Sequence, residues 1–480
     1  MKKTTRRTFV QASAATAVLG PALRARGANE AIRLGFIGVG GRGGGSASWF
    51  SKEKDARIAT LCDADAKRAA GVARKFKGSK STTDLRKVID DPDIDAVVIS
   101  TPNHWHCLAA IWAAQAGKDV YVEKPISHNI WEGHKLVEAA RKYKRMVQGG
   151  TQQRSDPLQA ELKSFLDSGA LGKIQFVRLN RFGVRGSIGK RDTPLPPPKD
   201  VDYDLWLGPA QEEPMYRKSF HYDWHWIWNT GNGELGNWGP HITDDCRNVV
   251  FRDKVSLPVR VCAGGGRFAW NDGGESPNTH FVYYDTGTVP VVMAIHNLPL
   301  KKGTTQGDVY ARLRTRGFLV IQCENGYYAG GRGGGAAFDN NGKVVKKFKG
   351  DGGRGHARNF LGAMRSRKSG DLKAEIEQIH YSSAWCHLGN IAYRLGGSSY
   401  DRAEAMGRVK GYKPWEELVE GFHTHLAANE IDAARAKIKL GPMLQVDPAA
   451  ETFTGASATP EALALLRREY RKGYVVPEQV

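Results

Sequence analysis

The sequence predicts an α/β fold in the first third of the chain and an α+β fold in the remainder. Between residues 31 and 103, short apolar runs alternate with helical patterns, an order typical of a parallel, doubly wound sheet. The first apolar run ends in the glycine-rich stretch GVGGRG at residues 38–43. After residue 155 this alternation stops, and runs such as KIQFVRLNRF at 173–182 predict strands without helices between them.

Length and composition narrow the class of protein. A chain of 480 residues exceeds what one hydrophobic core organises, which predicts two or three domains. Hydrophobic residues at 41% and charged residues at 25% exclude a disordered, collagen-like or polytopic membrane protein. The net charge is +20, but no zinc finger or RNA-binding motif accompanies it, so we predict no nucleic-acid partner. The six cysteines have no CxxC spacing, and we expect them to be buried and free.

The first 28 residues have the layout of a twin-arginine export signal. Arg6 and Arg7 precede an aromatic residue, and an uncharged stretch from 10 to 23 leads to small residues at 25–28. This stretch is shorter than the roughly 20 residues that span a bilayer. A membrane helix and a plain basic terminus are the alternatives. We therefore predict a periplasmic or secreted protein that is not held in a membrane in its mature form.

The glycine-rich stretch predicts a dinucleotide-binding turn, because it forms G-x-G-x-x-G between a strand and a helix. Gly38 permits the tight turn, Gly40 lets the backbone approach a pyrophosphate, and Gly43 allows close packing of helix on strand. Asp63 ends the next strand about 20 residues later, where a carboxylate accepts hydrogen bonds from ribose hydroxyls. This carboxylate predicts NAD, while Arg68 one helical turn further leaves NADP as the alternative.

Two polar stretches follow at the carboxyl ends of later predicted strands. One is STPNHWH at 100–106, and the other is YVEKP at 121–125. Ligands of open α/β sheets bind at this edge. Lys124 is placed there to exchange a proton with a substrate hydroxyl, and Pro125 after it is a candidate for a cis peptide bond.

These elements, in this order and spacing, resemble the glucose-fructose oxidoreductase, inositol dehydrogenase and rhizopine-catabolism (Gfo/Idh/MocA) family. The resemblance includes the glycine motif, TPNHWH, EKP and the stretch FHYDWHWIWNTGNGELGNWGPHITDD at 220–245, and it continues to the terminal YRKGYVVPEQV. It implies a Rossmann domain, then a domain whose open, largely antiparallel sheet supports a homo-oligomer, a dimer or tetramer. It also implies that Lys124 is catalytic, and it leaves His106 open between a packing and a substrate role. The predicted cofactor-binding residues are Gly38, Gly40, Gly41, Arg42, Gly43, Asp63, Thr101, Pro102, Asn103, His106, Glu123 and Lys124.

The second half concentrates aromatic and polar residues at 221–228 and 237–245. Aromatic faces beside polar edges suit the apolar face and the hydroxyl rim of a sugar ring. Packing in a core is the alternative for each tryptophan. His221 and His225 have a metal-ligand spacing, but the aromatic residues between them favour stacking, so we predict no metal. The predicted substrate-binding residues are Tyr222, Trp224, His225, Trp226, Trp228 and Trp238.

The predicted catalytic residues are Lys124, His241 and Asn237. His241 is the general acid and base, because an imidazole takes up a hydroxyl proton, and the run PHITDDCRNVV predicts a helix that starts at Pro240 and fixes its position. Many members of the resembled family have Asp four residues before this histidine. Asn237 stands there instead, and its amide holds a hydroxyl or orients the imidazole but cannot accept a proton.

The predicted function is an exported oxidoreductase that acts on a sugar, glycoside or polyol with a tightly bound NAD. Because an exported enzyme meets no replenished NAD pool, export favours a closed redox cycle, either between two sugars or in glycosidic cleavage through transient oxidation. An ordinary inositol or sugar dehydrogenase with exchangeable NAD is one alternative, and a non-catalytic, nucleotide-loaded sugar-binding protein is another. The predicted domains are the signal at 1–28, the NAD(P)-binding domain at 29–150, the substrate and oligomerisation domain at 151–440, and a C-terminal arm and helix at 441–480.

Overall fold

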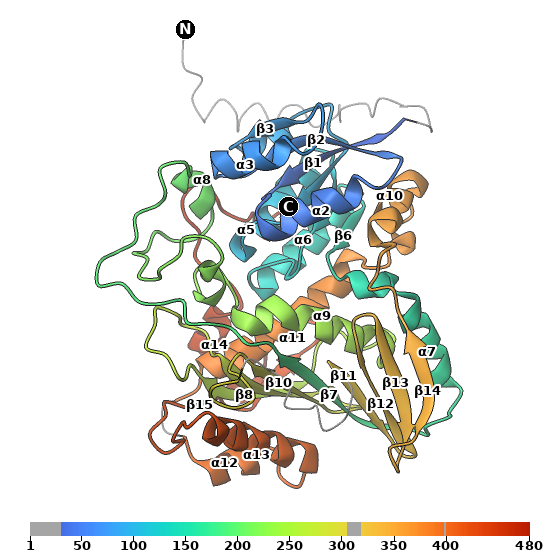
Figure 1. Ribbon diagram of the computed structural model, residues 1–480, viewed down its shortest axis with the longest axis vertical. Helices are drawn as coiled ribbons and strands as arrows, with labels where there is room; N and C mark the ends of the chain where they lie inside the picture. The colour runs from blue at the N-terminus through green and yellow to red at the C-terminus, as the bar shows by residue number, and fades with distance from the viewer. Residues whose placement is uncertain (1–29, 305–317, 398–399) are drawn as a thin grey trace.

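The computed structural model describes residues 30–304, 318–397 and 400–480. The predicted export signal at 1–28 lies outside the described residues. The described chain forms two sheets with their helices, and Figure 1 shows the first sheet, coloured blue to cyan, above the second. All six cysteines are buried and free, as the sequence predicts. Within the described ranges, no helix is both long and apolar enough to cross a bilayer.

The first sheet has six parallel strands in the order β3-β2-β1-β4-β5-β6, which confirms the predicted doubly wound fold. Its central strands are buried on both faces, as helix-covered parallel strands require. The strand order reverses between β1 and β4, so a crevice forms where their carboxyl ends diverge. The strands are β1 (Ile32–Ile37), β2 (Ala56–Cys62), β3 (Lys80–Thr82), β4 (Ala96–Ile99), β5 (Asp119–Val122) and β6 (Val147–Gly149), and the helices are α2 (Gly41–Phe50), α3 (Ala66–Ala73), α4 (Arg86–Ile89), α5 (Asn103–Gln115) and α6 (Ile130–Lys142).

The second sheet runs in the order β14-β13-β12-β11-β7-β10-β9-β8-β16-β17, with β15 paired to β8. The pair of β7 and β10 is parallel, and the other described pairs are antiparallel. This confirms the open, largely antiparallel sheet that the resemblance implies. The strands are β7 (Ile174–Phe182), β8 (Arg260–Gly266), β9 (Thr279–Asp285), β10 (Val291–His296), β11 (Leu319–Cys323), β12 (Gly326–Gly331), β13 (Gly334–Asp339), β14 (Val344–Lys349), β15 (Lys439–Leu440), β16 (Leu444–Asp447) and β17 (Thr452–Phe453).

Helices cover both faces of the second sheet. Helices α9 (Gly233–Val249) and α11 (Ile376–Arg394) lie between the two sheets, and α12 and α13 lie on the opposite face (Figure 1). Trp385 of α11 packs on Tyr284 of β9 in one core, and Phe422 of α13 packs on the other face. The remaining helices are α7 (Pro157–Asp167), α8 (Tyr203–Leu207), α10 (His356–Ser366), α12 (Arg402–Gly407), α13 (Lys413–Ala428) and α14 (Pro460–Ala464), with short 3-10 segments η1 (Gln152–Ser155), η2 (Asp223–Trp226), η4 (Ser369–Asp371) and η5 (Gly455–Ser457).

Packing does not follow the contiguous domain ranges that the sequence predicts. Phe360 of α10 lies against Phe50 and Tyr121 in the core of the first domain. Tyr474 and Val476 near the C-terminus join the core on its other face, and Figure 1 marks the chain end over this domain. The periodicity of a sequence predicts which face of a helix is apolar, but it does not predict the core against which that face packs. For this reason the sequence predicts one continuous second domain, although later segments of the chain pack against the first domain.

Helix α9 begins seven residues earlier than the sequence predicts. The prediction starts the helix at Pro240, whereas Pro240 lies inside a helix that begins at Gly233. Because proline lacks an amide hydrogen, Pro240 cannot donate the helical hydrogen bond to the carbonyl of Gly236. The packing around the helix outweighs the free energy lost with this hydrogen bond. As a consequence, Asn237 and His241 lie four residues apart on one face of the same helix.

Candidate active site

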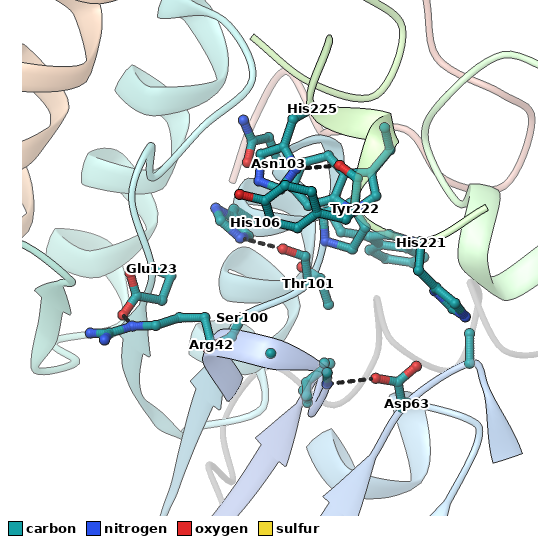
Figure 2. A pocket seen from close by; sticks show the side chains of 18 of the residues that line it. Arg42, Asp63, Ser100, Thr101, Asn103, His106, Glu123, His221, Tyr222 and His225 are labelled. Atoms are coloured by element: carbon teal, nitrogen blue, oxygen red, sulfur yellow. Dashed lines mark hydrogen bonds and ion pairs between the residues drawn. The ribbon is translucent and has the colours of Figure 1, made fainter. Parts of the chain in front are cut away.

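A cavity of about 520 Å³ lies along the carboxyl edge of the first sheet and extends to helix α9. Figure 2 shows side chains from β-strand ends and from the 221–225 segment facing this space. The structure therefore brings together groups as far apart in the chain as Ile37 and Arg332. Of the predicted residues, those that line the cavity are Gly38, Gly40, Gly41, Arg42, Asp63, Thr101, Pro102, Asn103, His106, Glu123, Lys124, Tyr222, Trp224, His225, Asn237, Trp238 and His241.

The glycine turn after β1 has the close approaches for which glycine is needed. Gly38 has a φ of 80°, and a Cβ there would lie 2.6 Å from the amide nitrogen of Thr101. A Cβ on Gly43 would lie 1.8 Å from the carbonyl oxygen of Gly38, so Gly43 packs helix α2 on the strand and does not line the cavity. Helix α2 begins at Gly41 without a side-chain cap, so its first amides face the cavity, the arrangement that binds anions.

Asp63 directly follows β2 and accepts hydrogen bonds from the glycine turn. Its Oδ2 accepts hydrogen bonds from the amides of Val39 at 2.9 Å and Gly40 at 3.1 Å, as Figure 2 shows in part. Burial raises the pKa of this carboxyl in spite of these hydrogen bonds. Arg68 lies on the same side, since a Cβ on Gly40 would be 2.5 Å from its Nη1. The carboxyl of Asp63 and the guanidinium of Arg68 thus border the end of the cavity where an adenosine ribose is expected.

His106 and Asn103 follow β4 in the chain, and both contact backbone or side-chain groups of other segments. The ring nitrogens of His106 lie 2.6 Å from the carbonyl oxygen of Pro125 and 2.8 Å from that of Thr101. The side chain is 2% exposed, and burial lowers its pKa. These contacts give His106 a packing role in the cavity wall, and they hold the loop in which the Lys124–Pro125 peptide bond is cis. Asn103 begins α5 and donates to Asn232 at 3.0 Å.

Glu123 at the end of β5 is held as a buried carboxylate. Its Oε1 accepts from Arg42 Nε at 2.6 Å and from Gln152 Nε2 at 3.2 Å (Figure 2). Burial raises its pKa, but the charges of Arg42 and Lys124 outweigh that effect, and the net shift is downward. Glu123 is therefore an anchor for two cations and is not free to accept a proton.

Lys124 is the titratable group of the cavity with a pKa near neutrality. Burial lowers the pKa of its amine to about 8, and the carboxylate of Glu123 opposes this shift only in part. The Nζ donates to the backbone carbonyl of Asn237 and, at 3.3 Å, to the Oδ1 of the same residue. Helix α9 therefore fixes the amine, and a substantial fraction of it is neutral in the physiological range.

Asn237 connects the lysine to a carboxylate that the sequence analysis missed. Its Nδ2 donates to Glu234 Oε2 at 3.2 Å, and Glu234 is 1% exposed one turn earlier on α9. Arg181 at 3.0 Å and Arg185 at 3.1 Å form ion pairs with this carboxylate. The acid is thus present near Lys124 although position 237 is an amide. The misplaced start of α9 concealed Glu234, because the prediction left it in a loop.

His241 faces the cavity as a neutral imidazole. It is 7% exposed, and burial lowers its pKa well below its ordinary value, to which the charge of Arg332 adds. Its Nδ1 has no hydrogen-bond partner among the described residues, and Trp238 packs edge-on at 5.8 Å between ring centroids. Arg332, another residue that the sequence analysis missed, lies in the turn between β12 and β13 and lines the cavity. The glycine run GGRGGG around it predicts a loop, but it does not predict that this loop reaches the cavity.

The aromatic stretch divides between the cavity and other surroundings. Trp224 and His225 stack at 3.6 Å between centroids and line the cavity with Tyr222. Two of the predicted tryptophans do not line this cavity: Trp226 is buried, with 4% of its surface exposed, and Trp228 lines a separate cavity. The segment contains the 3-10 turn η2, in which three residues complete a turn, so its side chains cannot all face one side.

The histidine pair with metal-ligand spacing does not converge in the structure. His221 Nε2 lies 3.0 Å from Asp65 Oδ2, whereas His225 Nδ1 lies 2.5 Å from the backbone carbonyl oxygen of Tyr222. The predicted absence of a metal at this pair stays a prediction, and these contacts favour it. Elsewhere, His134, His380 and Glu451 form a cluster of metal-ligand types in which both carboxylate oxygens already contact an imidazole.

Two family models match the chain. One, described as an oxidoreductase family NAD-binding Rossmann fold, matches residues 32–151, and the other, described as an oxidoreductase family C-terminal alpha/beta domain, matches residues 160–298. Together they match more than half of the chain. The protein therefore belongs to the Gfo/Idh/MocA family of oxidoreductases, and its first domain is an NAD-binding Rossmann fold.

Two named relatives are similar to parts of this chain. The levoglucosan dehydrogenase of Pseudarthrobacter phenanthrenivorans is 38% identical over 226 residues, 45% of this chain and 51% of that protein. Inositol 2-dehydrogenase 4 of Saccharopolyspora erythraea is 35% identical over 147 residues, 30% of this chain and 44% of its own length. This chain thus spans about half the length of the curated relatives that it matches.

Solved structures share the fold at low identity. The WlbA dehydrogenase from Bordetella pertussis, in complex with NADH and UDP-GlcNAcA, has a TM-score of 0.56 at 16% identity and covers 76% of this chain and 97% of its own. A levoglucosan dehydrogenase in complex with NADH and levoglucosan has a TM-score of 0.53 at 19% identity, with 74% and 97% covered. These likenesses show the two-domain architecture.

Proposed function

We propose that this protein is an NAD-dependent oxidoreductase that acts on a sugar, glycoside or polyol. The observation that carries the proposal is one continuous cavity that joins the glycine turn and Asp63 to Lys124, Asn237 and His241. Relatives named levoglucosan dehydrogenase and inositol 2-dehydrogenase support this substrate class. The aromatic rings of Tyr222, Trp224 and Trp238 on the far wall suit the apolar face of a sugar ring.

The residues of the cavity fit a dinucleotide. The uncapped start of α2 suits a pyrophosphate, and Asp63 suits the hydroxyls of an adenosine ribose. A tightly bound NAD is our proposal, with NADP as the alternative that Arg68 leaves open. When bound, NAD supplies the acceptor and donor of a hydride at the reacting carbon.

The chain's own residues handle the proton of the reacting hydroxyl. Lys124, as a neutral amine, accepts this proton, and the carbonyl and amide of Asn237 hold the amine in place. His241 is neutral, so its ring offers a hydrogen-bonding nitrogen to the same hydroxyl without adding charge.

The rate of substrate oxidation should rise with pH around a midpoint near 8. Only the deprotonated amine accepts a proton, and burial places the pKa of Lys124 at about 8, so the active fraction increases as pH rises through this value. The measurement is kcat for oxidation from about pH 6 to about pH 10. Burial and the charge of Asp244 also raise the pKa of Asp245 to about 8, so Asp245→Asn is the control. A rise that persists in this variant supports Lys124, and a rise that vanishes assigns the titration to Asp245.

We further propose that the enzyme is exported and that its reaction is redox-neutral. The twin-arginine layout of residues 1–28 supports export. Outside the cytoplasm the nicotinamide must end each turnover in its starting redox state. Glycosidic cleavage through a transient ketone meets this condition, and so does a coupled oxidation and reduction of two sugars. Assembly as a homo-oligomer belongs to the same proposal.

The test is to purify the folded protein and record the absorbance and fluorescence of retained nicotinamide while glycosides and free sugars are added. A closed cycle predicts a retained cofactor whose redox state returns to its start while product accumulates. Reduction of added NAD in proportion to product would instead identify an ordinary dehydrogenase. Retained nucleotide with sugar binding but no product would identify a non-catalytic binding protein.

A further inference from the structure

Glu234 is a buried carboxylate that does not line the cofactor cavity, and no step proposed above uses it. It lies in the first turn of α9, is 1% exposed, and is absent from the lining that the described residues give this cavity. Arg181 at 3.0 Å and Arg185 at 3.1 Å form ion pairs with it, and the Nδ2 of Asn237 donates to its Oε2 at 3.2 Å. Glu234 therefore does not touch a substrate in the cavity, and Asn237 is the residue that connects it to Lys124.

Glu234 fixes the orientation of the Asn237 amide. A carboxylate only accepts hydrogen bonds, so the Nδ2 of the amide must face Glu234 and the Oδ1 must face the other way. The Oδ1 lies 3.3 Å from the Nζ of Lys124 and accepts a hydrogen bond from it. The two ends of an amide group are nearly equal in size, so without this carboxylate the amide would be free to turn over and present its Nδ2 to the lysine.

The orientation of this amide matters because a neutral amine has two N–H groups and one lone pair. The Nζ of Lys124 donates to the backbone carbonyl of Asn237 and to its Oδ1, which uses both N–H groups. The lone pair is then left for the proton of a substrate hydroxyl, the step proposed above for this lysine. An amide turned the other way would instead donate from its Nδ2 to this lone pair and compete with the substrate.

We infer that Glu234 is a positioning residue, which acts through Asn237 to hold Lys124 with its lone pair free for the substrate proton. This role rests on the proposed function, because the lysine is the proton acceptor of that reaction. It also accounts for the amide at position 237, since the acid lies one turn earlier on α9 and the amide connects it to the lysine.

The charges that face Lys124 come from several elements. Burial lowers the pKa of the amine, and the carboxylates of Glu123 after β5 and Glu234 on α9 oppose this shift. The guanidinium groups of Arg42 on α2 and Arg332 in the β12–β13 turn add to it. Burial keeps four further groups near the amine uncharged, by lowering the pKa of three imidazoles and raising that of a thiol; they are His106, His225, His241 and Cys386. Removing the negative charge of Glu234 should therefore lower the pKa of Lys124.

Glu234→Gln tests this role by removing the charge while keeping the shape of the side chain. The pH midpoint of kcat for oxidation should fall by roughly 0.5–1 unit from its value of about 8, because a neighbouring negative charge is lost. The plateau of kcat at high pH should fall about tenfold, because the amide is free to turn over. KM should rise as well, since Arg185 also donates to the hydroxyl of Tyr222 in the cavity wall at 2.9 Å. The midpoint is therefore the decisive measurement.

Asp272→Asn is the matched control for the loss of a buried ion pair. The Asp272 side chain is 0% exposed, as is that of Glu234, and it lies 2.6 Å from Arg267, outside the lining of the cavity. This variant should also lose stability in urea denaturation, but it should keep the pH midpoint of the unchanged protein. A shift of the same size in both variants would assign the effect to general destabilisation and would overturn the role of Glu234.

A swap variant separates positioning from a structural role. Glu234→Gln combined with Asn237→Asp keeps one carboxylate at the site, and a carboxylate presents an oxygen to Lys124 in either orientation. Most of the lost kcat should therefore return and the pH midpoint should move back up, although Arg181 and Arg185 still lack a carboxylate partner at position 234. No recovery in the swap variant would show that Glu234 acts through those ion pairs, and it would overturn the inference.

A measurement that needs no turnover distinguishes this role from the proposed reaction itself. Competitive labelling of the purified protein with trace acetic anhydride over a pH series, followed by mass spectrometry of the Lys124 peptide, reports the pKa of the amine. The labelling midpoint should be lower in Glu234→Gln than in the unchanged protein, and it should be unaltered in Asp272→Asn. An unaltered midpoint in Glu234→Gln would overturn the inference. A lowered midpoint, with no hydride transfer by the unchanged protein, would support the link from Glu234 to Lys124 while the proposed reaction fails.

Discussion

Lys124→Ala is expected to lower kcat for sugar or glycoside turnover by about 10²–10⁴-fold, the range that a positioned general base contributes. The amine is the group in the cavity with a pKa near 8, and both Glu123 and Glu234 are already engaged by arginines. His241 lies in the same cavity, but burial holds its pKa well below its ordinary value, so it is a weaker base than the amine. Steady-state kinetics with a saturating cofactor measures the effect, and the KM should change much less than kcat.

The control for this prediction separates catalysis from cofactor binding. NADH binding, followed by fluorescence, should remain within a fewfold of that of the unchanged protein, because the glycine turn and Asp63 are untouched. Lys124→Arg is the matched substitution, since it keeps a cation but not a titratable amine near pH 8, and it should be nearly as inactive. Full turnover in Lys124→Ala would remove the lysine from the mechanism.

Arg154→Met is expected to destabilise the second domain by about 3–5 kcal/mol, because it leaves a buried carboxylate without its partner. Arg154 donates to Asp244 on α9 at 2.7–2.9 Å and to Asp253 at 2.8 Å, and its side chain is 4% exposed. Burial lowers the pKa of this guanidinium, but the two carboxylates reverse that shift and raise it. Urea denaturation followed by tryptophan fluorescence measures the loss.

A surface ion pair supplies the comparison for this prediction. Arg435 lies 3.5 Å from Asp432, and their side chains are 90% and 59% exposed. Arg435→Met removes the same chemical groups in solvent and should change stability by no more than about 1 kcal/mol. Equal effects of the two substitutions would mean that Arg154 does not anchor helix α9.

The first domain could be predicted from the sequence because its signals are local. Each strand is a short apolar run, each is followed by a helix, and the glycine turn with Asp63 falls at a fixed place in that order. The resemblance to the family then extended this to the second sheet. The cofactor end of the site, from Gly38 to Lys124, follows directly, since the carboxyl ends of neighbouring parallel strands must lie together.

The substrate end could be predicted only in part, because it depends on contacts between distant segments. Nothing near Glu234 in the sequence indicates that two arginines pair with it, and nothing near Arg332 shows that its turn reaches helix α9. Trp226 and Trp228 share the composition of their neighbours but face other directions. Aromatic clusters indicate a binding region, and backbone geometry decides which rings face the ligand.

Isotope transfer tests the central claim most directly. A panel of glycosides deuterated on the ring carbons would be incubated with the purified protein and NAD, and the nicotinamide would be released and analysed by mass spectrometry. When the reaction is quenched during turnover, the proposed oxidoreductase chemistry predicts deuterium on the reduced nicotinamide with the unchanged protein and none with Lys124→Ala, because a closed cycle returns the deuterium to the sugar before the turnover ends. Product formation from these glycosides with no deuterated reduced nicotinamide at any quench time would contradict it.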